Sequence, residues 1–224
     1  MKSIQWQKLS QNKYTHLLLS LILLIFSSAF VEEKAGSILL VLILWGAIII
    51  IIRTFKLTKI GRFFFDFISA IAFILLITDP INLTLNVDDY WSIAGYLIYS
   101  IFIGMSIFLI IKKILLDKNV SADTLLGGVC IYLLIGILWF LFYKIIHIID
   151  SDAFTESIEK EVDTQLVYFS FTTLTTLGYG DISPVHDFAR LLTNLEAIIG
   201  QMFPAIFIAR LVSLYTTQEL EDRD

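Results

Sequence analysis

Long apolar runs alternate with short charged segments along almost the whole of this sequence. The runs lie near residues 14–31, 37–52, 63–77, 90–111, 125–149 and 188–215. An apolar helix of roughly 20 residues crosses the hydrocarbon core of a bilayer, which is about 30 Å thick. The pattern therefore predicts six membrane-spanning helices, the second and third of which are short for a full crossing.

The composition supports a membrane protein. Of the 224 residues, 57% are hydrophobic and 17% are charged, and the mean hydropathy is +0.82. A water-soluble fold of this size could not bury so much apolar surface. Cys130 is the single cysteine, which excludes an intrachain disulfide, and three histidines leave little material for a metal site. We expect an all-α membrane protein that is not an enzyme, because the chain offers no constellation of nucleophile, base and oxyanion donor.

The charged residues between the runs predict the orientation. Basic residues in short loops are retained on the cytoplasmic side of the membrane. Here they fall in three segments: before the first run, between the second and third runs, and between the fourth and fifth runs. In that order they are Lys2, Lys8 and Lys13, then Arg53, Lys56, Lys59 and Arg62, then Lys112, Lys113 and Lys118. The remaining loops are acidic, so we expect a multi-pass protein of the plasma membrane with both termini in the cytoplasm. The net charge of −5 argues against a nucleic-acid partner.

The first run has an alternative interpretation. A secretory signal peptide has a basic start, an apolar middle and a cleavage site of small residues. Three lysines, LLLSLILLIF and SSAF follow one another in this order. Its removal would leave five spans in the same orientation. The charged segment 112–123 is the predicted boundary between a four-helix membrane region, residues 1–120, and a pore domain, residues 121–216. Residues 217–224 are then a cytoplasmic tail.

The segment between the fifth and sixth runs has a different character. Residues 163–175, DTQLVYFSFTTLT, are apolar enough to enter a bilayer but too few to cross it, which predicts a re-entrant half-helix capped by Asp163. Its negative C-terminal end would point toward the membrane centre and attract a cation. The next residues, TLGYGD, place two glycines at alternate positions, so that successive carbonyls can face one side. Non-helical backbone at membrane depth lines an aqueous path or is buried in protein, so we expect a pore.

Here the sequence resembles the potassium channel superfamily. TTLTTLGYGD is similar to the selectivity-filter signature of that family, with Leu177 where many members have valine. The resemblance extends over roughly 125–215, and EAIIGQMFPAIFIARLV is similar to the inner helices of bacterial members. It implies a channel that conducts K⁺ passively and selectively. One alternative is the ion-translocating subunit of a potassium uptake transporter, although such subunits usually hold four degenerate filter segments in one chain. Another is a regulatory membrane protein that co-assembles with channels, against which the intact GYG counts.

A dehydrated cation needs a shell of oxygens, and one extended strand offers only one oxygen at each level. About four strands must therefore converge on one axis, which predicts a homotetramer. The expected K⁺ ligands are carbonyls of the filter residues, with the Thr176 hydroxyl as the lowest ring; the filter comprises Thr176, Leu177, Gly178, Tyr179 and Gly180. No cofactor is expected besides the permeating ion.

Further residues are expected to support this filter. By resemblance, Tyr168 is an aromatic donor in the pore helix, and its hydroxyl is expected to bind the carboxylate of Asp181. Thr172 occupies a position that carries glutamate in some bacterial members. Glu196 lies within the sixth run, where a carboxylate is expensive unless it is partnered. Thr172, Thr173 or an ordered water are the candidate partners, and a hydrated carboxylate near the interface is the alternative.

The sixth run also contains a weak helical turn. Pro204 has no amide hydrogen and leaves the carbonyl of Gly200 without its helical donor. Because inner helices of the family gate by bending at a glycine, Gly200 and Pro204 are the candidate gate hinge; a static kink is the alternative. The fourth run has no basic residue before Lys112, so we expect no arginine-based voltage sensor. Asp66 lies four residues after Arg62 and is expected to pair with it.

Overall fold

A computed structural model describes residues 13–28, 34–53, 55, 57–85, 89–116, 122–155 and 162–221. Over these residues the protein is helical. The elements are α2 (Lys13–Ser28), α3 (Lys34–Arg53), α4 (Lys59–Leu85), α5 (Asp89–Leu116), α6 (Ala122–Ile149), the 3₁₀ helix η1 (Ser151–Ala153), α7 (Val162–Leu174) and α8 (Asp187–Glu221). A single bridge between Phe154 and Pro184 is the only strand-like pairing among the described residues. The predicted all-α class is confirmed.

A helix lies at each predicted apolar run. Three of them are long and apolar enough to cross a membrane, at Tyr90–Leu116, Asp123–Ile149 and Asp187–Leu214. Two shorter apolar helices lie at Tyr14–Ile25 and Leu42–Arg53. The protein is therefore a membrane protein, while the count of six spans stays a prediction. Some residues behind the predicted orientation, namely Lys2, Lys8, Lys56 and Lys118, lie outside the described part of the chain.

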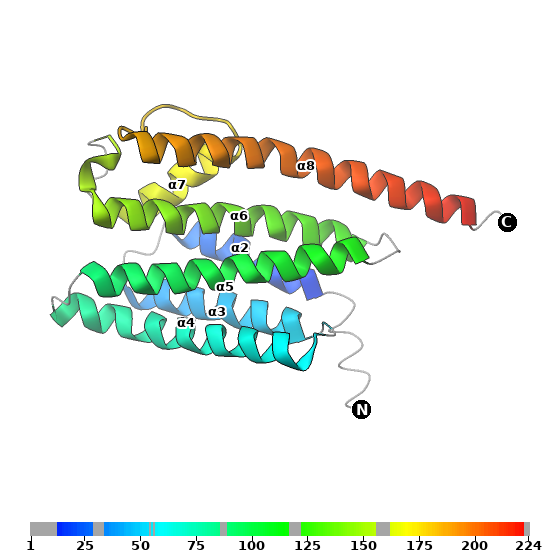
Figure 1. Ribbon diagram of the computed structural model, residues 1–224, viewed down its shortest axis with the longest axis horizontal. Helices are drawn as coiled ribbons and strands as arrows, with labels where there is room; N and C mark the ends of the chain where they lie inside the picture. Colours follow the sequence, from blue (N-terminus) through cyan, green and yellow to red (C-terminus); the bar gives the residue numbers. More distant parts are fainter. Residues whose placement is uncertain are drawn as a thin grey trace.

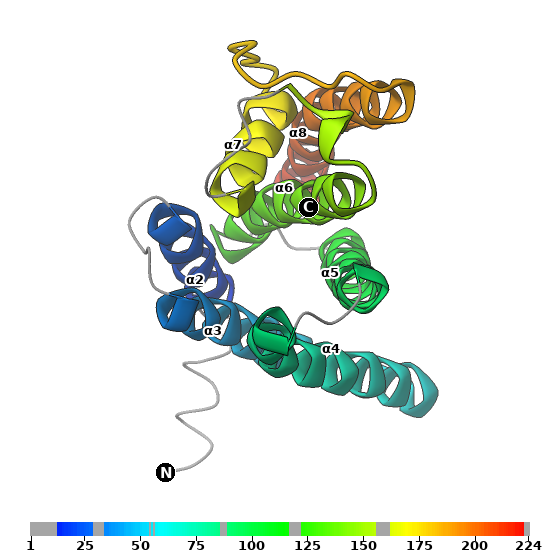
Figure 2. The same cartoon turned by 90° about the vertical axis from the view of Figure 1, so that its left-hand side faces the viewer.

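Helix α6 is the central element of the bundle. It packs against α2 and α5 on one side and against α7 and α8 on the other. Figure 2 shows α7 and α8 together on one side of α6, with α2, α3, α4 and α5 on the other. The last turns of α8 extend beyond the ends of the other helices (Figure 1). Helices α2 and α5 thus pack directly on the helix that supports α7, while α3 packs mainly on α2 and α4 mainly on α5.

Glycines on α6 allow its neighbours to approach closely. A Cβ atom at Gly128 would overlap the ring of Phe207 on α8, and one at Gly136 would lie 2.8 Å from the ring of Phe171 on α7. On another face, Gly127 makes room for the ring of Tyr14 on α2, which a Cβ would meet at 3.1 Å. Each missing side chain is replaced by an aromatic ring from another helix, so the packing specifies how the helices fit together.

The predicted ion pair of Asp66 is corrected by the structure. Asp66 pairs with Arg53 at the end of α3 at 3.0 Å, and the guanidinium of Arg62 instead reaches the carbonyl oxygen of Phe55 at 3.5 Å. The reason is the short connection between α3 and α4, which brings Arg53, the last residue of α3, opposite Asp66 near the start of α4. Both side chains of the pair are partly exposed, so its contribution to stability is small.

Candidate functional site

Helix α7 is too short to cross a bilayer. Its 13 residues span about 20 Å, against a hydrocarbon core of about 30 Å. Asp163, predicted as its cap, is the second residue of the helix, and its carboxylate pairs with Lys144 of α6 at 2.5 Å. A negative charge in the first turn still interacts favourably with the helix dipole. The pair fixes the start of α7 against the end of α6.

The backbone after α7 alternates in handedness. Thr176, Gly178 and Gly180 have φ angles of 57°, 51° and 82°, in the left-handed region. Glycine adopts this region without cost, whereas Thr176 does so at some expense. When every second residue is left-handed, consecutive peptide units no longer alternate their carbonyls from side to side as they do in a strand. The two glycines thus supply the angles that the sequence predicts.

The amide hydrogens of this loop point back to α7. The backbone N–H groups of Leu177 and Gly178 both donate to the carbonyl oxygen of Thr172, at 2.8 and 3.1 Å. In a planar trans peptide the carbonyl points opposite to the N–H of the same unit. The carbonyls of Thr176 and Leu177 are therefore directed away from α7. Sequence reasoning assigned Thr172 a side-chain role, but its backbone oxygen is the group that holds the loop.

The loop faces open space in the single chain. Residues 175–180 are all exposed, and the large side chains of Leu177 and Tyr179 are 55% and 69% exposed. In contrast, the end of α7 behind them is buried, including Thr172, Thr173 and Leu174. The loop therefore presents its backbone oxygens on one side while α7 supports the other.

Tyr168 and Asp181 are in contact, as the sequence suggests. The Tyr168 hydroxyl donates to Asp181 Oδ2 at 2.8 Å, and this hydrogen bond lowers the pKa of Asp181. The backbone N–H of Ile182 donates to the other carboxylate oxygen at 3.0 Å. The ring of Tyr168 also stacks on that of Tyr179, with 6.4 Å between centroids. The end of the loop is thus connected to the middle of α7. Whether this contact supports function stays a prediction.

The chain that leaves the loop is bound to the segment after α6. The backbone N–H of Thr155 donates to Ser183 at 3.0 Å, and that of Val185 donates to Ala153 at 2.8 Å. Asp150 forms an ion pair with His186. These contacts hold the chain after the loop against the segment that follows α6. Asp150 is both the partner of His186 and the N-cap of η1.

Glu196 is fully buried, and its partners differ from those expected. Ser170 Oγ lies 2.6 Å from Glu196 Oε1, and the Tyr143 hydroxyl binds Oε2. The proposed partners Thr172 and Thr173 are wrong, because the hydroxyl of Thr172 turns back to the carbonyl of Phe169 and the carboxyl group faces α6 and α7 instead. Its 0% exposure also rules out the hydrated alternative. The polar residues Ser170 and Tyr143 were not singled out in the sequence, although each lies in an apolar helix.

Helix α8 touches the base of the loop. A Cβ atom at Gly200 would overlap the carbonyl oxygen of Leu174, which also accepts a hydrogen bond of 3.2 Å from the Tyr132 hydroxyl. Next to it, Gln201 Nε2 donates to Thr176 Oγ1 at 2.9 Å. Pro204 lies within α8, and the helix continues on both sides of it. Gly200 therefore has a packing role at the loop; hinge motion there stays a prediction. Gln201 was missed, although it is a polar residue in an apolar run.

The short helix α7 ends in a loop with carbonyls on one side and lies between two long apolar helices, α6 and α8, which is the arrangement that the sequence predicts for a pore. Residues 127–217 match a family model described as an ion channel. The chain is also 35% identical over 99 residues to the voltage-gated potassium channel Kch of Escherichia coli (strain K12). That match covers 44% of this chain and only 23% of the relative. No solved structure matches the chain significantly. These two matches confirm the predicted resemblance to the potassium channel superfamily over this part of the chain.

Proposed function

We propose that this chain is the subunit of a homotetrameric channel that conducts K⁺ passively and selectively. The observation that carries the proposal is the pair of bonds from the N–H groups of Leu177 and Gly178 to Thr172, which direct two consecutive carbonyls to the exposed side. Four copies around one axis supply rings of oxygens that replace the hydration shell of the ion. The carbonyls of Thr176, Leu177, Gly178 and Tyr179 are the proposed ligands, with Gly180 completing the filter.

The exposed surfaces of the single chain support assembly. Only 11% of the residues in the apolar window of α8 are buried, against 56% in that of α6. Large apolar residues on α8 are exposed from its first turns to Val212, at Leu191, Leu195, Ile198, Ile199, Met202, Ile206, Ile208 and Val212. An apolar helix that contacts little of its own chain is suited to contact neighbouring subunits near a central axis. We therefore assign α8 as the inner helix of the tetramer.

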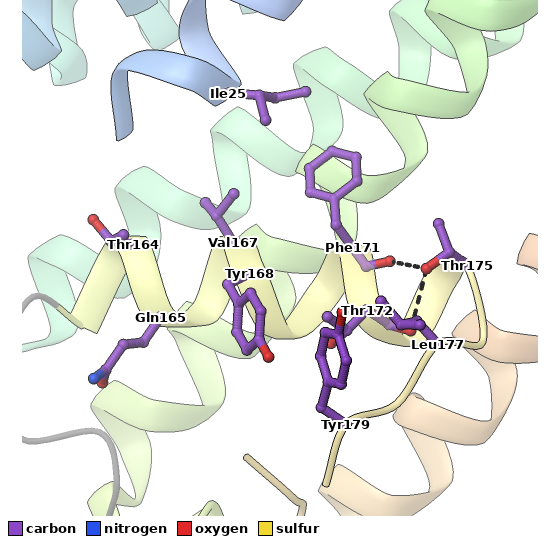
Figure 3. Close-up of a pocket in the computed structure, with 10 residues that line it drawn as sticks. All are labelled: Ile25, Thr164, Gln165, Val167, Tyr168, Phe171, Thr172, Thr175, Leu177 and Tyr179. Carbon is purple, nitrogen blue, oxygen red and sulfur yellow. Dashed lines mark hydrogen bonds between the residues drawn. The ribbon is translucent and has the colours of Figure 1, made fainter. Parts of the chain in front are cut away.

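A groove beside the loop is the proposed seat of a neighbouring subunit. Figure 3 shows its lining residues on α2, α7 and the loop: Ile25, Thr164, Gln165, Val167, Tyr168, Phe171, Thr172, Thr175, Leu177 and Tyr179. It lies on the side of α7 that carries Tyr168. Carbonyl oxygens that converge on one axis repel one another and push the four filter strands apart. Contacts on the side of the filter away from the axis would oppose this movement. Filling of this groove in the tetramer would thus complete the support of the filter.

The N-terminal helices contribute further membrane spans in this proposal. With α2, α3, α4 and α5 in the bilayer, the chain has six spans, a re-entrant α7 and both termini in the cytoplasm. Helix α5 has no Lys or Arg before Lys112, so we propose that gating does not use an arginine array of the usual kind. The relative is named as a voltage-gated channel, and we propose that the present chain differs from that description in its gating.

Flux in liposomes tests the proposal. Purified protein is reconstituted under opposed K⁺ and Na⁺ gradients, and the reversal potential is measured. We expect it to lie near the equilibrium potential of K⁺. A reversal potential that follows Na⁺, or no current at any voltage, would contradict the proposal. Flux that requires a second protein would instead favour the subunit of an uptake system. Counting subunits by chemical cross-linking is expected to give four.

A further inference from the structure

The contact between Gln201 and Thr176 joins the inner helix to the lowest residue of the loop. Gln201 Nε2 donates to Thr176 Oγ1 at 2.9 Å, across 25 residues of sequence. The approach is possible because the preceding residue, Gly200, has no side chain where α8 meets the carbonyl of Leu174. Both Gln201 and Thr176 are exposed in the single chain. The contact therefore lies at the open end of the loop and not in the interior of the bundle.

The hydrogen bond restricts the Thr176 hydroxyl. A threonine hydroxyl has one hydrogen and two lone pairs on its oxygen. The amide of Gln201 occupies one lone pair, and the hydroxyl hydrogen must point elsewhere. The other lone pair stays available to a cation. Without Gln201 the hydroxyl rotates freely and can turn its hydrogen toward the cation position, so the amide prepares the oxygen before an ion arrives.

We propose that Gln201 is a positioning residue for the lowest cation site, and that it acts through the hydroxyl of Thr176. The ligand of that site is a dehydrated cation of the size of K⁺. This inference rests on the proposed function, because it needs four copies of Thr176 around one axis. It goes further by assigning a residue of α8 to ion binding, whereas the filter sequence contains only residues of the loop.

Barium is the probe for this site. Ba²⁺ is close in size to K⁺ and carries twice the charge, so it binds more tightly to oxygen ligands arranged for K⁺ and blocks the current. It is applied from the cytoplasmic side to channels in a planar bilayer. We expect Gln201→Leu to raise the half-blocking Ba²⁺ concentration by about tenfold, since four hydrogen bonds are lost and each contributes modestly. The control variant Thr216→Val removes a side-chain hydrogen bond within the later part of α8, far along the helix from Gln201, and we expect it to be blocked like the wild type.

A double-mutant cycle shows whether Gln201 acts through Thr176. Thr176→Val removes the hydroxyl oxygen, and Gln201→Leu is then expected to cause no further change in block. A change of the same size in both backgrounds would overturn the inference, because Gln201 would then act independently. Block of Gln201→Leu at the wild-type concentration would overturn it as well. Should that variant fail to assemble, Gln201→Met keeps the length of the side chain and provides the same comparison.

The two proposals fail in different ways. A wild-type protein that carries no K⁺-selective current contradicts the proposed function, and the barium measurement then has no role in that conclusion. A wild-type K⁺ current together with unchanged barium block in Gln201→Leu and Gln201→Met contradicts only the role of Gln201.

Discussion

Ser170 Oγ lies 2.6 Å from Glu196 Oε1 and 2.8 Å from the carbonyl oxygen of Gly136. These contacts join α7 to α8 and to α6 within the buried interior. The Tyr143 hydroxyl of α6 binds the second oxygen of Glu196. Ser170 has a single hydroxyl hydrogen for two neighbouring oxygens, so all contacts are satisfied together when the carboxyl group of Glu196 itself holds a hydrogen and donates it to Ser170. The buried side chain of Glu196 on α8 thus connects α6 and α7 as well.

This hydrogen count predicts how replacements of Glu196 behave. Glu196→Gln keeps a group that donates to Ser170 and accepts from Tyr143, so we expect a melting temperature near that of the wild type. Glu196→Leu leaves the Tyr143 hydroxyl without its acceptor and the Ser170 oxygen without its donor. We expect it to lower the free energy of unfolding by about 1–3 kcal/mol per site. Thermal unfolding of the purified protein in detergent measures both variants. Equal damage by Gln and Leu would show that a charged carboxylate is required.

The contact between Tyr168 and Asp181 predicts a pH-dependent support of the loop. Tyr168→Phe removes the donor while the ring that stacks on Tyr179 remains. We expect currents of the variant to decline faster during sustained activity at neutral pH. The pKa of Asp181 is lowered by this bond, so the stabilising effect of the bond is present at neutral pH and is lost as the pH falls through that lowered pKa.

Currents recorded at several pH values of the outer solution check this prediction. The difference between the wild type and Tyr168→Phe should be full at pH 7 and should shrink under strong acidification. A difference that is constant over the whole range would mean that the hydrogen bond to Asp181 is not its cause.

Gly178 tests the left-handed backbone. Its φ angle is 51°, and a Cβ atom there would meet nothing within 4 Å, so space does not forbid alanine but the backbone angle does. A left-handed alanine costs roughly 1–2 kcal/mol, and the cost arises four times around one axis. We expect Gly178→Ala to assemble and to lose K⁺ flux in liposomes.

Gly104 provides the matched control. It lies in α5, and a Cβ atom there also meets nothing within 4 Å, but its φ angle is not positive. Gly104→Ala is expected to keep its flux. Wild-type flux in Gly178→Ala, with both proteins eluting as tetramers, would refute the proposed role of the loop.

Pro204 is predicted to influence opening and not ion preference. Pro204→Ala supplies an amide hydrogen to the carbonyl of Gly200 and strengthens the helical turn that lies against Leu174. We expect a shift in open probability in single-channel records, because bending a stiffer helix requires more free energy. The permeability ratio of K⁺ to Na⁺ is expected to stay the same, since the α8 side chain that hydrogen-bonds to the filter residue Thr176 is that of Gln201. An altered ratio would contradict the assignment of Pro204 to the hinge.

Local sequence patterns predicted much of the site. Residues 163–181 have the lengths, glycines and polar ends that produce a short helix and a left-handed loop, and both helix and loop are present. The contact of Tyr168 with Asp181 was also accessible, because the resemblance places an aromatic donor at Tyr168 and the two residues are only 13 positions apart. The partners of Glu196 were not, because Ser170 and Tyr143 lie 26 and 53 residues away on two other helices.

By itself, the sequence determined that the protein is helical, lies in a membrane and has a left-handed, glycine-containing loop after a short helix, because apolar run lengths and glycine positions act through local geometry. Only the tertiary structure decided which groups face one another: Arg53 with Asp66, Glu196 with Ser170, and Gln201 with Thr176. The physical reason is that these contacts depend on how helices rotate and approach. Glycines such as Gly200 control that approach, and their effect is visible only once the neighbouring helix is in place.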